Sequence, residues 1–169
     1  MNNKRFDLTR HAPLGMNVNS QFTTYITLFV LATLYSFFYF NRFSNHLEWL
    51  YEWSRSAKVL IEGAVMPDFV ELLEDALTWF WAAAGVCLLQ IPFNYRHHYR
   101  ETKSIYLMKR LPKKFELHRR CLTLPILGAG IMVLFSFVLL LLYFWYYMAK
   151  VPSQCMQPDQ WAKIWSVLR

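Results

Sequence analysis

Histidines and cysteines are the residues of this sequence with the clearest capacity to bind a metal or to act as nucleophiles. His97 and His98 are adjacent, so their rings cannot share one helix face, and no acid or cysteine lies at a spacing that would complete a site around them. Of the three cysteines, Cys87 lies within one long uncharged run, Cys121 at the start of another and Cys155 in the polar tail, so we expect them at different depths of a membrane. We therefore expect no metal site, and we expect no internal disulfide framework.

Motifs for nucleotide and zinc chemistry are also missing from the sequence. It contains no G-x-x-x-x-G-K-[ST], no G-x-G-x-x-G, no H-E-x-x-H and no C-x-x-C. Nucleotide hydrolysis, dinucleotide binding and zinc catalysis therefore have no local signature here. We expect that the chain is not an enzyme and that it binds no cofactor of its own.

Long runs without charged residues indicate which type of element positions the polar residues of this chain. Of the 169 residues 56% are hydrophobic, above the 45–50% typical of soluble domains. Three stretches of 31, 20 and 29 residues lack Asp, Glu, Lys and Arg, and each can hold the roughly 20 apolar residues that cross a bilayer as a helix. We predict a single all-α integral membrane domain over 1–169, with three transmembrane helices at 21–41, 76–93 and 122–148.

The uneven distribution of charge predicts how these helices are oriented. The net charge is +7, and residues 93–122 hold nine bases against two acids, whereas residues 42–75 hold three bases against seven acids. Basic residues near span ends stay on the cytoplasmic side. We expect a multi-pass protein of the plasma membrane, with segment 1–20 and loop 94–121 in the cytoplasm, and with loop 42–75 and tail 149–169 outside. Because the basic stretch lies between two spans, nucleic acid is not an expected partner.

The polar connections carry helical patterns of their own. Apolar residues recur at helical spacing over His46–Met66, which predicts an amphipathic helix at the outer membrane surface, with Trp49 and Trp53 at the interface. Pro67 breaks that helix, and Asp68 is a suitable cap for the helix that becomes the second span. The tail sequence DQWAKIWSVLR predicts a short surface helix.

Few polar side chains are expected inside the spans. Gln90 and Asn94 are the amides of the second span region, and the spans hold no Asp, Glu, Lys or Arg, which counts against an ion pump or a proton relay. Small residues at 82–85 and 128–130 permit close helix packing. We interpret the aromatic runs 37–40 and 143–147 as an aromatic belt near the outer surface.

The basic loop is the most informative segment of the sequence. It reads FNYRHHYRETKSIYLMKRLPKKFELHRRCLTLP over residues 93–125, and Pro112 divides it into two short predicted helices. Tyr106, Leu107, Leu111 and Phe115 lie there on a basic background, which suits a partner protein. The alternative is that the charges only set the topology and contact anionic lipid.

The order Lys103-Ser104, Tyr106, Arg110-Leu111-Pro112 and Lys113-Lys114 resembles the first cytoplasmic loop of permeases of ATP-binding-cassette (ABC) transporters of the second exporter type, especially those of Gram-positive bacteria. In that family the loop is a coupling helix that docks on a cytoplasmic ATPase subunit, which binds the ATP and Mg²⁺. The resemblance implies that the docking residues here are Lys103, Ser104, Tyr106, Leu107, Lys109, Arg110, Leu111, Pro112, Lys113 and Phe115.

With three spans, the chain is expected to be a small membrane subunit of an ABC-type exporter, which couples ATP hydrolysis on the partner to transport through residues 103–120. It would act together with other membrane subunits or with copies of itself. The alternative that we keep open is a non-transporting scaffold or regulatory subunit of another membrane complex.

Overall fold

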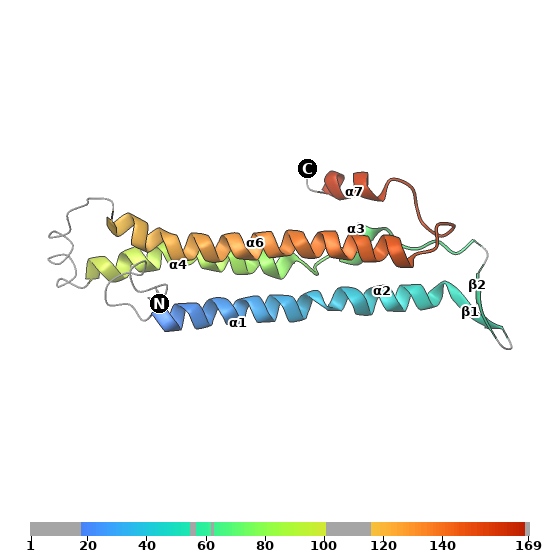
Figure 1. The fold of residues 1–169 in the computed structure, drawn as a ribbon, viewed down its shortest axis with the longest axis horizontal. Coiled ribbons are helices and arrows are strands. Elements are labelled where there is room, and N and C mark those ends of the chain that lie inside the picture. The colour runs from blue at the N-terminus through green and yellow to red at the C-terminus, as the bar shows by residue number, and fades with distance from the viewer. Residues whose placement is uncertain (1–17, 55–56, 62, 101–115, 168–169) are drawn as a thin grey trace, which may run out of the picture. The chain divides into compact units, whose positions relative to one another are not determined.

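A computed structural model describes residues 18–54, 57–61, 63–100 and 116–167 (Figure 1), and 77% of these residues are helical. The mostly helical character of the chain is therefore confirmed. The elements are α1 (Val18–Ser36), α2 (Phe38–Trp49), β1 (Tyr51–Ser54), β2 (Ala57–Leu60), α3 (Phe69–Leu73), α4 (Thr78–Arg100), α6 (Glu116–Lys150) and α7 (Gln160–Val167).

Two stretches of helix are long and apolar enough to cross a membrane. They are Asn19–Trp49, which covers α1 and α2, and Cys121–Lys150 in α6. At a rise of 1.5 Å per residue, each is about 45 Å long, more than the ~30 Å hydrocarbon core requires. Only 22% and 28% of their most apolar windows are buried by the rest of the protein. The helix at the core of a soluble protein would instead be mostly buried.

The other predicted span, 76–93, falls on α4, which is not one of the two stretches long and apolar enough to cross a membrane, so a third span stays a prediction. This helix begins at Thr78 and includes Pro92 within its length. The expected continuous helix from Asp68 is divided, because α3 ends at Leu73 and Glu74 adopts a positive φ of 31°. That backbone conformation is uncommon for a residue with a side chain, and it turns the chain between α3 and α4.

The amphipathic helix predicted over His46–Met66 is absent from this segment. The helix α2 ends at Trp49, and β1 and β2 follow as an antiparallel hairpin in which Tyr51 pairs with Leu60 and Ser54 with Ala57. The residues of β1, Tyr-Glu-Trp-Ser, alternate aromatic and polar, which is the period of a strand, and aromatic residues favour strands. The spacing of the apolar residues is therefore compatible with a helix and with a hairpin. The segment forms the hairpin, which the two-residue alternation of β1 favours.

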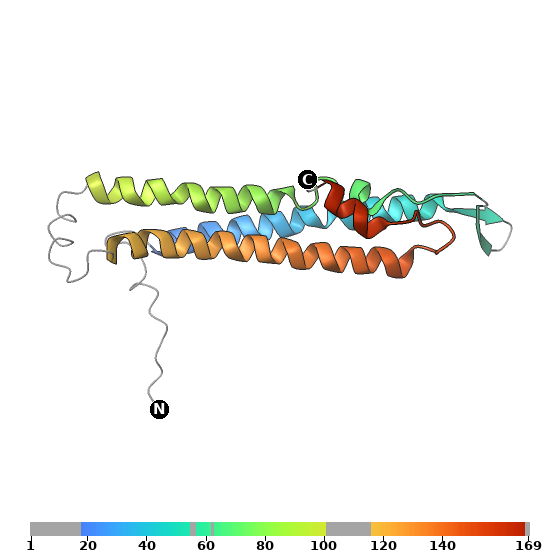
Figure 2. The same cartoon turned by 90° about the horizontal axis from the view of Figure 1, so that it is seen from above.

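The chain divides into two compact units. The first unit consists of residues 1–31 and 80–135, and the second of residues 32–79 and 136–169. In the first unit, α1, α4 and α6 lie side by side in both views (Figures 1 and 2), and the rings of Phe29, Phe80 and Phe135 meet in their core.

The second unit has an aromatic core. The rings of Tyr39 and Tyr143 stack with centroids 4.5 Å apart, and Phe69 packs against Tyr147 at 5.7 Å. With Phe43, these side chains are 4% exposed or less. Large aromatic side chains contribute much of the apolar area that a small core can bury. The unit therefore has a packed interior of its own.

Candidate functional site

The ten docking residues implied by the resemblance lie in segment 101–115, outside the described residues. The predicted pair of helices around Pro112 lies there too and stays a prediction. What the structure does describe is the helix on each side of this segment, α4 before it and α6 after it.

Hydrogen bonds join these two helices close to the basic segment. The Tyr95 hydroxyl and His118 Nδ1 are 2.7 Å apart, and their rings lie 5.7 Å apart. One residue earlier on α4, Asn94 donates from Nδ2 to the backbone carbonyl of Cys121 on α6 at 3.3 Å. The end of α4 and the start of α6 are therefore linked by two side chains.

Helix α1 joins the same network through Gln21. Its Nε2 donates to Asn94 Oδ1 at 3.0 Å, and both side chains are buried, with Asn94 fully so. Asn94 thus contacts all three helices of the first unit. Sequence reasoning singled out Asn94 as a polar residue of the second span but assigned it no partner, and it missed Gln21, which lies at the edge of the predicted first span. Gln90, the other amide, is half-buried.

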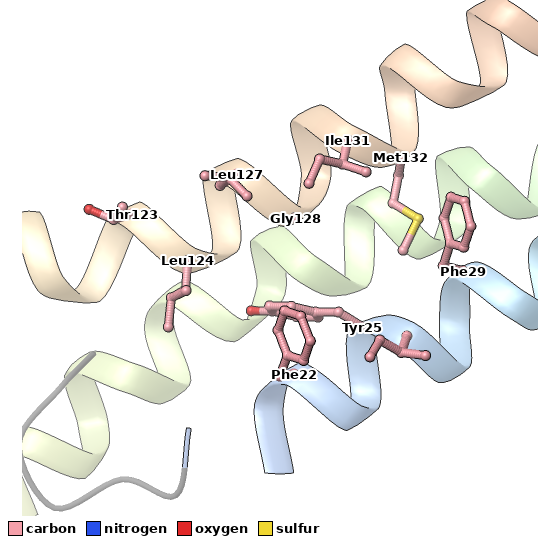
Figure 3. A pocket seen from close by; sticks show the side chains of 10 residues that line it. Phe22, Tyr25, Phe29, Thr123, Leu124, Leu127, Gly128, Ile131 and Met132 are labelled. Atoms are coloured by element: carbon pink, nitrogen blue, oxygen red, sulfur yellow. The ribbon is translucent and has the colours of Figure 1, made fainter. Parts of the chain in front are cut away.

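A pocket of about 430 Å³ opens between α1 and α6 of the first unit. Its lining is apolar except for Tyr25 and Thr123 (Figure 3), and the Thr123 hydroxyl donates to the carbonyl of Arg119. Thr123 lies at one end of the pocket, and Phe29 and Met132 lie at the other. Its volume falls within the roughly 300–1,000 Å³ of sites that bind small molecules.

Gly128 forms part of the pocket wall where the helices approach one another. A Cβ at this position would lie 3.5 Å from the Tyr25 ring and 3.5 Å from Cys87 Sγ. These are ordinary contact distances, so Gly128 lies close to both α1 and α4, whereas a Cβ at Gly130 would meet no other atom within 4 Å. The Tyr25 hydroxyl is buried and has no hydrogen-bond partner among the described residues.

Groups suited to catalysis or metal binding are sparse in the part of the chain that the structure describes. No three His, Cys, Asp or Glu side chains lie close enough there to hold a metal ion. Cys87, Cys121 and Cys155 are all described, and each is buried with a free thiol. The described geometry suits the positioning of helices and the binding of an apolar group.

The aromatic runs interpreted as a membrane belt contain both buried and exposed side chains. Tyr39, Tyr143 and Tyr147 are buried in the second unit, where the Tyr147 hydroxyl donates to the carbonyl of Pro67 at 3.0 Å and Tyr143 is hydrogen-bonded to Ser36. Phe37, Phe38 and Trp145 are more than half exposed and remain available for a belt. The sequence does not separate the two groups, because neighbours in a run differ only in the helix face they occupy.

The predicted surface helix of the tail is confirmed as α7, and it docks on the start of α3. Gln160 Oε1 accepts from the backbone N–H of Phe69 at 2.9 Å, while Lys163 Nζ donates to Asp68 Oδ1 at 2.7 Å. The Lys163 hydrogen bond, with a second from Gln160 Nε2, holds the pKa of the Asp68 carboxyl below its ordinary value against the opposing effect of burial. Asp68 occupies the N-cap position, yet its carboxylate makes no capping bond to α3 and is committed to α7.

Comparison of the chain with protein-family models, with curated proteins and with solved structures found no match. A functional assignment therefore depends on the residues and the geometry described above. The two features that bear on it most directly are the hydrogen-bonded network around Asn94 and the exposed apolar surfaces of the long helices.

Proposed function

We propose that the chain is a small multi-pass subunit of a membrane complex and that it receives motion from a cytoplasmic partner through its basic loop. Three helices cross the plasma membrane in this proposal: α1 with the start of α2, α4, and α6. The exposed apolar side chains of the two stretches long enough to cross a membrane, Asn19–Trp49 and Cys121–Lys150, support it, since water would not favour them on a soluble protein. The basic loop lies in the cytoplasm and the tail outside, as the distribution of charge favours.

The partner that we favour is the ATPase subunit of an ABC-type exporter, which would supply the ATP and Mg²⁺. The single observation that carries a coupling role is the network at the two ends of the loop. Tyr95 and His118 link α4 to α6, and Asn94 links both helices to Gln21 of α1. A force applied to the loop would therefore move the ends of all three helices together, instead of bending one helix away from the others.

Coupling in this proposal is mechanical. ATP closes the ATPase dimer, the docked loop is displaced, and the hydrogen bonds at its two ends pass the displacement to the membrane helices. Side-chain hydrogen bonds between membrane helices contribute about 0.6 kcal/mol each on average, and the network around Asn94 combines two of them. The chain itself needs no catalytic group for this role.

Association with the partner can be tested directly. The tagged chain is extracted from its native membrane in mild detergent, and the proteins that come with it are identified by mass spectrometry. Leu111→Asp combined with Phe115→Asp should remove the ATPase from the eluate while membrane insertion is retained, because charges would enter an apolar docking surface. Val59→Asp is the matched control, since Val59 is exposed on β2, which lies on the opposite side of the membrane in this proposal. An ATPase retained by the double variant would exclude this docking site.

The alternative is a non-transporting scaffold or regulatory subunit. It is favoured by the lack of acidic and basic side chains within the three spans, since a path for polar substrates usually includes some. Repeated recovery of another membrane protein, with no ATPase, would identify the scaffold as the correct function.

A further inference from the structure

We propose that the pocket between α1 and α6 binds one acyl chain of an anionic phospholipid, whose head group lies at Arg119. The inference rests on the membrane-spanning part and the topology of the proposed function and not on the partner. It is carried by the size, lining and length of the pocket and by the charge at one of its ends.

The lining matches a hydrocarbon chain. Ile26, Leu127 and Ile131 line the pocket and are about half exposed, so an apolar surface is left uncovered by the described residues. The Thr123 hydroxyl already donates to the Arg119 carbonyl. The Tyr25 hydroxyl is the lining group that has no partner among the described residues, and the rest of the lining offers a ligand apolar contacts only.

The length of the pocket matches one leaflet. On α6 the lining extends from Thr123 to Met132, and this separation of nine residues is about 13.5 Å along a helix. Half of a ~30 Å hydrocarbon core is about 15 Å. A chain that enters at Thr123 would therefore reach Met132 near the middle of the bilayer.

The pocket volume of about 430 Å³ lies within the range of sites that take a small molecule or a single chain. A helix of a partner or of a second copy would lie along the open side of the pocket, and the test below distinguishes that occupant from a lipid.

The charge at one end identifies the head group. Arg119 is exposed and lies four residues before Thr123 on α6, hence one turn beyond the pocket on the same face. This end faces the cytoplasmic leaflet in the proposed topology, and that leaflet carries the anionic lipids. A phosphate bound to Arg119 would thus hold a lipid whose chain occupies the pocket.

The test uses the purified full chain in detergent with phosphatidylglycerol and with phosphatidylcholine of the same acyl chains. Native mass spectrometry counts the lipid retained, and phosphatidylglycerol with a photoreactive acyl chain maps the contact. We expect phosphatidylglycerol to be retained about fivefold better than phosphatidylcholine, as one basic contact would give. Labelling should fall on residues 22–29 and 123–132.

Two variants and two controls separate the pocket from the rest of the surface. Ile26→Trp fills the pocket and should lower labelling severalfold with either lipid, whereas Arg119→Gln should remove only the preference for phosphatidylglycerol. The controls are Leu134→Trp, which is exposed on α6 and outside the lining, and Arg96→Gln on α4, and both should behave as the parent chain.

Equal retention of the two lipids by the parent chain would overturn the assignment of the head group. Labelling spread evenly over α1, α4 and α6 would overturn the pocket. A dimer mass without bound lipid would show that a second copy occupies the groove instead. Arg119→Gln keeps the test decisive if Ile26→Trp does not fold, because Arg119 is exposed and its replacement leaves the packing unchanged.

Discussion

Asn94 shows how much one side chain contributes to the first unit. It is fully buried, its carbonyl oxygen accepts from Gln21, and its amide nitrogen donates to the backbone of Cys121. A primary amide is suited to this position because it offers a donor and an acceptor in opposite directions. An apolar side chain would leave both of the other helices without their bond, and a hydroxyl would have to make both bonds from a single atom.

Asn94→Leu should therefore destabilise the protein by about 1 kcal/mol, since it keeps the volume of the side chain but removes both hydrogen bonds. The measurement is thermal unfolding of the purified chain in detergent. Arg96→Leu, two residues along α4 and exposed, is the control and should unfold at the parent temperature. Equal unfolding temperatures for Asn94→Leu and the parent would show that the network does not hold the three helices together.

Protonation of the Asp68 carboxyl should weaken the contact between α7 and the start of α3. Because its pKa in the folded chain is lowered, its contribution to stability is present above the ordinary value of 3.8 and is lost as the pH falls through the folded pKa. Thermal unfolding measured against pH should give the parent a higher unfolding temperature than Asp68→Asn at neutral pH, and this difference should disappear in acid. Glu71→Gln, exposed on α3, is the control. A difference that is the same at every pH would mean that the ion pair with Lys163 is not its source.

At the scale of elements, the hairpin is the sharpest departure from what the sequence predicts. Its strands hold four residues each, and Glu52 faces Val59 across the ladder. Gly63, three residues after β2 ends, has φ of 82°, a conformation that favours glycine. A helix in this segment would have neither the pairing of Glu52 with Val59 nor the positive φ of Gly63.

A double variant distinguishes the two structures. Glu52→Cys with Val59→Cys should form a disulfide on mild oxidation, because facing residues of an antiparallel pair have Cα atoms about 5 Å apart. In a helix the same residues would be about 10 Å apart along the axis, too far for a disulfide. Peptide mass spectrometry, in a chain whose native cysteines are replaced by alanine, reads the result. Glu52→Cys with Lys58→Cys places the thiols on opposite faces and should stay reduced.

The sequence predicts the long helices well and their interruptions poorly. The predicted spans 76–93 and 122–148 lie close to α4 and within α6, because uncharged length is a strong signal. The turn at Phe37 has no such signal: its N–H bonds to the carbonyl of Leu34, three residues back, which tightens the helix there. Tertiary contacts determine a change of this kind, and a pattern of residue types does not contain them.

The candidate site, too, is predicted only in part by the sequence. Patterns of charge and composition indicate a docking loop, whose residues at 101–115 lie outside the described structure. They do not indicate which buried amides bond to one another, because Gln21 and Asn94 are 73 residues apart in the chain. The pocket escapes prediction for the same reason, since its walls belong to two helices separated by more than ninety residues.

For the whole molecule, the proposed topology predicts which positions a membrane-impermeant maleimide reaches on intact cells. With the native cysteines replaced by alanine, Ser153→Cys in the outer tail should be labelled from outside. Lys103→Cys in the basic loop should be labelled only after the cells are permeabilised. Ser153 is exposed in the second unit, so failure to label it would reflect sidedness and not burial. The opposite pattern would reverse the topology, and the loop could not then meet a cytoplasmic ATPase.

The order of synthesis gives the contact between Gln160 and Phe69 a further meaning. The backbone N–H of Phe69 finds its acceptor on a residue translated 91 positions later, so α3 lacks this bond while the chain is still on the ribosome. A chain that stops before residue 160 would still contain the long helices, but the Phe69 N–H would lack its acceptor on Gln160.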